Sequence, residues 1–313
     1  MKNVKLFFSL LMFVGFVATS CQKEYFGEED FGEDFFEDSS EGAITLYQVV
    51  GDDIIKLKDF AGASQSYQLD TEKHLEMWNF FATLIPSNDR RFLSEFEIFD
   101  GENELLGYVQ PINDNDLTKW KMGLAIDAAN RLDKLNLSNE FAYTCIHEHG
   151  HILTLNHEQV DVTTSEANCD SYHPGEGCPI ENSYIGRIIE IGWSDILDEH
   201  SRIDSDEEVY DFYEKYPNRF VTEYAATNPA EDVAEVFTMF VILDEMPNSN
   251  TIADQKVKAM YEFPELVELR EAIRSQPIGR TLKPSDLIKP GRKHKCRHGL
   301  HQHKTSKKAT LRP

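Results

Sequence analysis

The sequence predicts an α+β fold in which a small, mainly antiparallel sheet is followed by one long helix and then by a helical lobe. Three observations predict it. Short strand-like runs lie between residues 96 and 126, an apolar segment with a histidine cluster spans 139–156, and helical periodicity dominates 184–243. The chain has 313 residues, of which 41% are hydrophobic, and this is enough for one sizeable core.

The N-terminus has the composition of a secretion signal. Lys2 and Lys5 precede the apolar run Leu6–Val17, which is too short to span a membrane comfortably. The small residues Ala18–Ser20 before Cys21 resemble a bacterial lipobox. We therefore predict a lipoprotein signal peptide over 1–20 and a lipid anchor on Cys21. The expected location is the bacterial cell envelope, at the outer membrane and exposed at the surface. Ordinary signal cleavage with an incidental Cys21 is the alternative.

The two ends of the mature chain carry opposite charges. Residues 22–42 contain nine acidic residues and one lysine without helical or strand periodicity, so 21–42 is predicted to be a disordered tether. An acidic stretch after a lipidated cysteine also resembles the surface-export signals of some bacterial lipoproteins. Residues 283–313 contain ten basic residues and one acidic residue. Because the histidine-rich end has little apolar content, 290–313 is predicted to be a disordered basic tail, which leaves 43–289 as the folded domain.

The overall net charge of −24 argues against one class of partner. An acidic surface repels the phosphates of nucleic acids and the headgroups of anionic lipids, so we expect no nucleic-acid partner. Membrane association is expected through the lipid on Cys21 instead. We expect the folded domain to be a monomer.

Three strand-like runs precede the histidine cluster. Phe96–Phe99 and Leu105–Val109 are separated by Asp-Gly-Glu-Asn, a typical turn sequence, so we predict that they pair as a hairpin. Trp120–Ile126 is predicted to be a third strand. Together these runs are expected to form the small sheet.

Helical periodicity predicts several segments on either side of this sheet. Residues 71–85 are expected to form an amphipathic helix that Pro86 ends. Its apolar positions are Leu75, Trp78, Phe81 and Ile85. Residues 184–203 and 207–216 are mostly helical in pattern, and an apolar helix is expected over about 229–243.

The strongest chemical signal is the run H-E-H-G-H that begins at His147, inside a helix predicted over 139–156. On a helix, His147 and His151 are four residues apart and share one face, which is the geometry that a zinc ion needs from two ligands. Glu148 then lies beside the metal, where it can take a proton from bound water. His149 points away from this face and is not expected to be a ligand.

A catalytic zinc site needs a third protein ligand, and two residues compete for this role. His157 lies ten residues after His147, which is the metzincin spacing. Metzincins, however, turn the chain with a glycine where this sequence has Thr154. The alternative interpretation of His157 is a polar residue just past a helix end, which is favourable near a helix C-terminus.

Glu231 is the second candidate. Asn228 is a good N-cap and Pro229 suits the first position of a helix. Glu231 and Glu235 are four residues apart, so Glu231 could bind zinc while Glu235 accepts the outer N–H of a ligand histidine. Asn228 and Glu231 also fit a capping box, which needs no metal. From these residues alone, the third ligand stays open.

The two motifs together resemble those of a family of zinc-binding metallopeptidase lipoproteins, which pair HE-x-x-HIL with Y-A-x-x-x-P-x-E-D-x-A-E. The second motif is also similar to the Y-x-x-T-N-x-A-E-x-x-A-E of anthrax lethal factor, a gluzincin. This chain has H-E-H-G-H-I-L from His147 and Y-A-A-T-N-P-A-E-D-V-A-E from Tyr224. It departs from the family at Val233, where an aromatic residue is usual, and in its His-rich tail. The resemblance covers about residues 70–245.

The resemblance implies a zincin-like metallopeptidase domain and a set of site residues. One Zn²⁺ would be held by His147, His151 and Glu231. Glu148 would be the general base, and Glu235 would support a ligand histidine from behind. Tyr224 would donate a hydrogen bond to the developing oxyanion, although a core tyrosine is the alternative interpretation of this residue.

We therefore expect a zinc-dependent peptidase of the gluzincin type, lipid-anchored at the cell envelope, that hydrolyses peptide bonds in a peptide or protein substrate. The alternative belongs to a different class. It is a surface lipoprotein that keeps the zincin fold and the metal but acts as a binding protein with little turnover. The complete set of base and ligands argues against that alternative.

The remaining cysteines and histidines carry weaker signals. Cys169 and Cys178 flank a Pro/Gly loop, and in an oxidising envelope they either form a disulfide or stay free; the sequence leaves both open. Cys145 is expected to pack as a small apolar group. Five residues of the tail could bind metal, but their spacing matches no structural zinc module. They are His294, Cys296, His298, His301 and His303.

Overall fold

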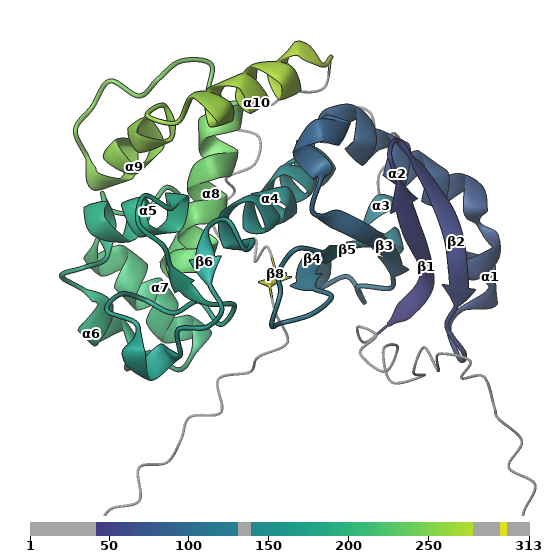
Figure 1. Cartoon of the computed structure of the whole chain (residues 1–313), viewed down its shortest axis with the longest axis horizontal. Helices are drawn as coiled ribbons and strands as arrows, with labels where there is room; N and C mark the ends of the chain where they lie inside the picture. Colours follow the sequence, from purple (N-terminus) through teal and green to yellow (C-terminus); the bar gives the residue numbers. More distant parts are fainter. Residues whose placement is uncertain (1–41, 131–138, 278–294, 299–313) are drawn as a thin grey trace, which may run out of the picture. The chain divides into compact units, whose positions relative to one another are not determined.

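The computed structural model describes residues 42–130, 139–277 and 295–298. Its main sheet has six strands in the order β2-β1-β3-β5-β4-β8 (Figure 1). Most of the helices come after β5 in the sequence. Three of the neighbouring pairs are antiparallel, namely β1–β2, β1–β3 and β4–β5, whereas β3–β5 and β4–β8 are parallel. The α+β class and the small, mainly antiparallel sheet are therefore confirmed.

The described chain begins with a hairpin that the sequence analysis did not identify. Strand β1 (Ala43–Val50) pairs with β2 (Asp53–Asp59), and the turn between them contains Gly51 at a φ of 63°. Strand β1 is buried over its first five residues, because it lies inside the sheet between β2 and β3. Strand β2 is the outer edge of the sheet on this side.

Two helices follow the hairpin, α1 (Gln65–Leu69) and α2 (Thr71–Leu84), and α2 matches the helix predicted over 71–85. Asp70 caps α2 by accepting a hydrogen bond from the backbone N–H of Lys73 at 3.2 Å. Trp78 and Phe81 are buried as predicted, and the Trp78 ring lies 5.3 Å from that of Phe96 in the sheet. Leu75 was predicted on the buried face but is 46% exposed. The buried face is shifted toward Met77 and Leu84.

The hairpin predicted between Phe96–Phe99 and Leu105–Val109 is wrong. Strands β3 (Leu93–Phe99) and β4 (Leu105–Pro111) do not pair with each other, because β5 (Trp120–Ala125) lies between them. Strand β5 runs parallel to β3 and antiparallel to β4. All six residues of β5 are buried, as expected of a strand in the middle of a covered sheet.

A long-range contact explains why the turn after β3 does not close a hairpin. Asp127, at the start of α3 (Ile126–Asn130), accepts hydrogen bonds from the backbone N–H groups of Gly101 and Asn103, both at 2.8 Å. Glu102 and Asn103 both have positive φ, at 52° and 62°. The turn is therefore shaped by the chain that follows β5, which leaves room for β5 between its two neighbours.

Helix α4 (Asn139–Leu155) crosses the middle of the molecule and ends one residue before the predicted boundary. It packs against both β4 and α8 (Pro229–Ile242), a helix that is buried along its whole length (Figure 1). Gly150 allows the close approach of α4 to α8. A Cβ atom at this position would lie 3.2 Å from the ring of Phe237 and 3.4 Å from the Cα of Ala234. The two helices are thereby held in register along their facing sides.

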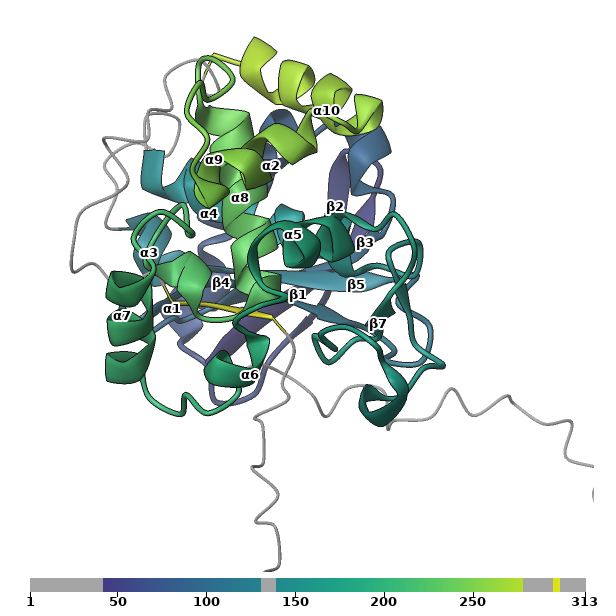
Figure 2. The ribbon, with the colours of Figure 1, turned by 90° about the vertical axis from the view of Figure 1, so that its left-hand side faces the viewer.

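The helical lobe predicted after α4 is confirmed, and Figure 2 views the molecule from the side of this lobe. Besides α8 it contains α5 (Tyr184–Gly192), α6 (Leu197–His200), α7 (Asp206–Lys215), α9 (Ile252–Met260) and α10 (Pro264–Ser275). Three short 3-10 helices complete the described chain, η2 (Ser87–Arg90), η4 (Glu166–Asn168) and η5 (Tyr224–Ala226).

A disulfide-closed loop lies between α4 and the lobe. Cys169 and Cys178 form the disulfide that the sequence left open, with their Cα atoms 5.5 Å apart. The connection between α4 and α5 also contains a two-stranded sheet, in which β6 (Val160–Asp161) pairs with β7 (Cys178–Pro179).

Four residues of the tail that we expected to be disordered form a strand. Strand β8 (Lys295–His298) pairs in parallel with β4. The other predicted tail residues lie outside the described part of the chain, as do the signal peptide, Cys21 and all of the acidic tether except Gly42. Among the described residues, the helices are all too short or too polar to span a membrane.

Candidate metal centre

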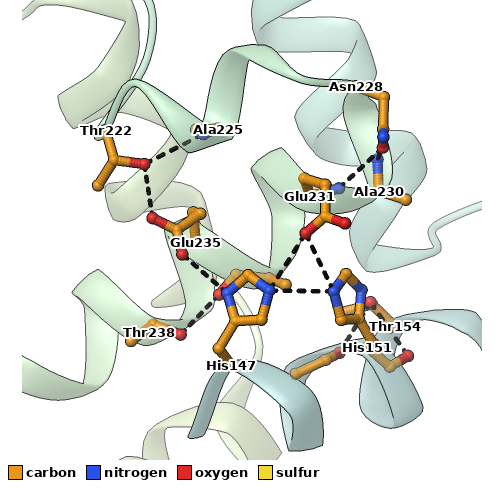
Figure 3. A network of polar contacts seen from close by, with 12 residues as sticks. His147, His151, Thr154, Thr222, Ala225, Asn228, Ala230, Glu231, Glu235 and Thr238 are labelled. Atoms are coloured by element: carbon orange, nitrogen blue, oxygen red, sulfur yellow. Dashed lines mark hydrogen bonds and ion pairs between the residues drawn. The ribbon is translucent and has the colours of Figure 1, made fainter. Parts of the chain in front are cut away.

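Helix α4 brings His147 and His151 to one side, as the helical spacing predicted. Both side chains are fully buried, and their Nε2 atoms lie 3.1 Å apart. Glu231, in the first turn of α8, points its carboxylate at this pair (Figure 3). Its Oε2 atom lies 3.1 Å from Nε2 of His147 and 3.2 Å from Nε2 of His151. Three potential ligand atoms thus form a nearly equilateral triangle.

The triangle has the dimensions of one face of a tetrahedral metal site. Bonds of about 2.0–2.1 Å in tetrahedral geometry place ligand atoms about 3.3 Å from one another. The three observed separations of 3.1, 3.1 and 3.2 Å are close to that value. These three residues can therefore hold one metal ion. With three protein ligands, a tetrahedral ion bound there would have a fourth position for water, which is the ligand count of catalytic sites.

Glu235 supports the site from behind His147. Its Oε1 atom lies 2.7 Å from Nδ1 of His147, which is the contact that the sequence analysis expected (Figure 3). When Nδ1–H is donated to Glu235, the neutral ring keeps the lone pair of Nε2, and this atom belongs to the triangle. Glu235 thereby fixes both the tautomer and the orientation of His147.

The Glu235 carboxylate accepts further hydrogen bonds from the hydroxyl groups of Thr222 and Tyr143. Burial acts to raise the pKa of Glu235, but the bonds from His147, Thr222 and Tyr143, together with attraction to His147, outweigh it. The pKa of this carboxyl therefore lies below its usual value. Glu235 is held as a carboxylate although it is only 2% exposed.

We predict that Glu235→Gln weakens metal binding by about 10–100-fold, the usual cost of losing an outer contact to a ligand histidine. The carboxylate accepts hydrogen bonds from His147, Thr222 and Tyr143, and the N–H group of the glutamine amide would face one of these donors. We therefore also expect a loss of about 1–3 kcal/mol in the free energy of unfolding. Zinc titration against a chelating indicator and thermal unfolding measure these effects. Glu245→Gln, at an exposed position after α8, is the control and should change neither; equal effects of the two substitutions would contradict the role given to Glu235.

The first turn of α8 is held by two further sets of contacts. Asn228 caps the helix, and its Oδ1 atom accepts from the N–H groups of Ala230 at 2.9 Å and Glu231 at 3.0 Å. Asp232 accepts hydrogen bonds from Nε1 of Trp193, at 2.6 Å, and from Nζ of Lys256. These contacts join the turn that carries Glu231 to the end of α5 and to α9.

Asp232 and Lys256 form a completely buried ion pair, with both side chains at 0% exposure. Burial raises the pKa of Asp232 and lowers the pKa of Lys256, and their mutual attraction opposes both shifts. Such a pair is costly to break, because the charge that remains is buried without a partner and without contact to water. The pair therefore locks α9 onto the turn that presents Glu231.

Lys256→Met is accordingly expected to lower the free energy of unfolding by about 3–5 kcal/mol, because it leaves Asp232 buried without its cation. Chemical unfolding monitored by tryptophan fluorescence measures this loss. Lys258→Met is the matched control on the same helix, and it should cost less than about 1 kcal/mol because Lys258 bonds only exposed acceptors. A loss of the same size in both variants would contradict the locking role of the pair.

Glu148 is completely buried and lies against strand β4. A Cβ atom on Gly107 of β4 would come within 2.9 Å of Glu148 Cγ and within 2.9 Å of Thr144 Cγ2. Only a glycine at position 107 therefore lets the backbone of β4 approach α4 at this point. The candidate base and the backbone of β4 share one small region.

Tyr224 lies in η5, just before α8, and is half-buried. Its ring centroid is 5.8 Å from that of His147, at an interplanar angle of 52°. The structure thus places Tyr224 next to a residue of the metal triangle. Its role toward an oxyanion stays a prediction.

The structure does not bring His157 to the histidine pair. His157 is exposed past the end of α4 and packs edge-on against Phe92, with ring centroids 5.3 Å apart. Among the described residues, the group that can hold a metal contains Glu231 in its place. The metzincin alternative for the third ligand is therefore not supported.

The other two singled-out residues of α4 are buried away from the triangle. His149 packs against Phe81, and burial, with a smaller effect of the Arg90 charge, lowers its pKa to about 3. His149 is therefore a neutral core residue. Cys145 is fully buried, and burial raises the pKa of its thiol well above the usual value, which agrees with the predicted apolar packing.

Several residues that shape the site were missed by sequence reasoning. Tyr143 lies four residues before His147, so the helical period could have placed it on the same face. Thr222 is 13 residues from Glu235 and belongs to a loop, so no local pattern reveals it. Lys256 lies 24 residues from Asp232, and an isolated lysine in a helix gives no sign of burial.

Comparison with protein-family models, with curated proteins and with solved structures finds no match to this chain. The assignment of a function therefore rests on the geometry of the site and on the motif residues that form it.

Proposed function

We propose that this protein is a zinc-dependent peptidase with a zincin-like active site. The observation that carries the proposal is the triangle of His147, His151 and Glu231 with Glu148 next to the first ligand on α4. Two imidazole nitrogens and one carboxylate oxygen are a donor set that suits zinc, and three protein ligands leave the fourth position for water or substrate. Zinc held there would act as a Lewis acid toward a peptide carbonyl and would lower the pKa of bound water.

The residues around the triangle supply the remaining chemistry. Glu148 accepts a proton from the attacking water and passes it to the leaving amine. Tyr224 donates a hydrogen bond to the oxygen on which negative charge develops. Glu235 holds His147 in one tautomer throughout, with Thr222 and Tyr143 fixing the carboxylate. The location that we propose is the cell envelope, through a lipid on Cys21.

Metal reconstitution tests the proposal. The protein is stripped with a chelator, reloaded with zinc and incubated with an unbiased peptide library, and cleavage is read by mass spectrometry. We expect about one zinc per chain and cleavage only after reloading. Zinc binding without any cleavage of peptides would contradict the peptidase and favour a metal-containing binding protein.

A further inference from the structure

The outer edge of β4 lies beside the proposed base. The backbone of β4 approaches α4 so closely at Gly107 that an added Cβ atom would be 2.9 Å from Glu148 Cγ and 3.1 Å from its Oε1. Strand β5 covers one edge of β4, which leaves the other edge for pairing. An extended peptide that added to this edge would therefore run past Glu148.

The chain's own C-terminal segment occupies that edge. Strand β8 pairs with β4 in parallel, and the register places Cys296 opposite Gly107 and Arg297 opposite Tyr108. Strand β8 also lies near α4, the helix that carries Glu148 (Figure 1). Because β8 is the last strand in the sheet order, it covers the edge that a peptide would use.

We propose that the edge of β4 is a peptide-binding edge, and that β8 is its resident occupant, which excludes other extended peptides. The proposal rests on the proposed function insofar as the excluded peptides are substrates. In that case the C-terminal tail inhibits the enzyme in cis, and activation requires that β8 be displaced or removed.

Two features favour a reversible occupant over a permanent strand. Within the described part of the chain, β8 pairs with β4 at four positions, with a register shift between Leu105 and Gly107, so few backbone hydrogen bonds hold the described strand. Its attachment to the same chain compensates, because pairing within one chain does not depend on the protein concentration. Residues 283–313 carry ten basic residues and one acidic residue, in a chain whose net charge is −24. Attraction between this basic segment and the acidic remainder favours docking and is weakened by salt.

A pair of proline substitutions in the full chain tests the pairing. Successive residues of a strand direct their N–H groups to opposite sides, so Cys296→Pro with Arg297→Pro removes one donor to β4 in either alignment. Cys296→Ala with Arg297→Ala changes the same side chains and keeps both N–H groups. We expect hydrogen exchange in β4 (Leu105–Pro111) to accelerate at least about 10-fold in the proline variant and to stay at the wild-type rate in the alanine variant.

A peptide added in trans provides a second measurement that needs no catalysis. The probe is a fluorescent peptide with the sequence of residues 291–300. We expect it to bind the proline variant at least about 10-fold more tightly than wild type, where β8 already holds the edge. Equal exchange rates and equal peptide affinities in wild type and proline variant would overturn the proposal.

Cleavage assays separate this inference from the peptidase proposal. If the proline variant gains exchange and peptide binding while no form of the protein cleaves peptides, the occupied edge stands and the peptidase proposal fails. If wild type cleaves, we expect kcat/KM to rise at least about 10-fold in the proline variant and the added peptide to inhibit it. A proline variant that frees β4 and still cleaves at the wild-type rate would overturn the inhibitory role of β8.

Discussion

Replacing Glu231 by glutamine is expected to weaken zinc binding by more than about 100-fold. The loss of a residue that only supports a ligand costs up to about 100-fold, and the loss of a ligand should cost more. Glu231 supplies one corner of the triangle, at 3.1 Å and 3.2 Å from the two histidine nitrogens. A neutral amide oxygen is a weaker ligand than a carboxylate, and the site loses its only negative charge among the three ligand groups. Competition with a chelating indicator measures the dissociation constant.

His157→Ala is the control for this prediction. His157 has the spacing of a metzincin ligand but lies exposed against Phe92, so its removal should leave zinc affinity unchanged. If Glu231→Gln keeps full zinc affinity while His157→Ala loses it, a metal site built from α4 and α8 would be contradicted. The comparison also separates a ligand from a surface histidine without any assumption about the reaction.

Replacing Glu148 by glutamine should lower kcat/KM by about 10²–10⁴-fold, the range in which general acid–base groups contribute. Glutamine keeps the size of the side chain, so the buried contact with β4 at Gly107 is preserved. It cannot accept the proton of the attacking water. Because Glu148 is not one of the three ligand residues, we expect zinc binding to stay within a few-fold of wild type.

The matched control for Glu148→Gln is Glu158→Gln, at an exposed position where the carboxylate pairs with Arg91. Its kcat/KM should equal that of wild type, because surface ion pairs contribute little. Both variants are assayed on the peptide that wild type cleaves best, with zinc content measured in the same samples. A fully active Glu148→Gln variant would show that the base lies elsewhere.

The helices that carry the site could be predicted because their signals are local. The spacing of His147 and His151 and the capping sequence Asn228-Pro229 specify α4 and α8 within a few residues along the chain. The pairing of Glu235 with a ligand histidine also followed from a helical repeat of four residues. The choice between Glu231 and His157 did not follow from spacing alone, because it depends on how α8 packs against α4.

The order of the strands, by contrast, depends on contacts between residues that are far apart in the sequence. A turn sequence between two strand-like runs predicts a hairpin, yet the turn after β3 is held by Asp127, which lies beyond β5. The position of β5 therefore depends on a contact between residues that are 24 and 26 positions apart. Strand β8 likewise lacks an apolar pattern and is defined by its pairing with β4, so its sequence resembles a solvated tail.

The location of a bound zinc ion tests the central claim most directly. Crystals of the zinc-loaded full chain would be measured at the zinc absorption edge, and the anomalous difference map gives the position of the ion independently of any assay. We predict one peak within about 2.0–2.2 Å of Nε2 of His147, Nε2 of His151 and a carboxylate oxygen of Glu231. A peak at His157 or at the histidines of the C-terminal tail, with none at the triangle, would contradict the account.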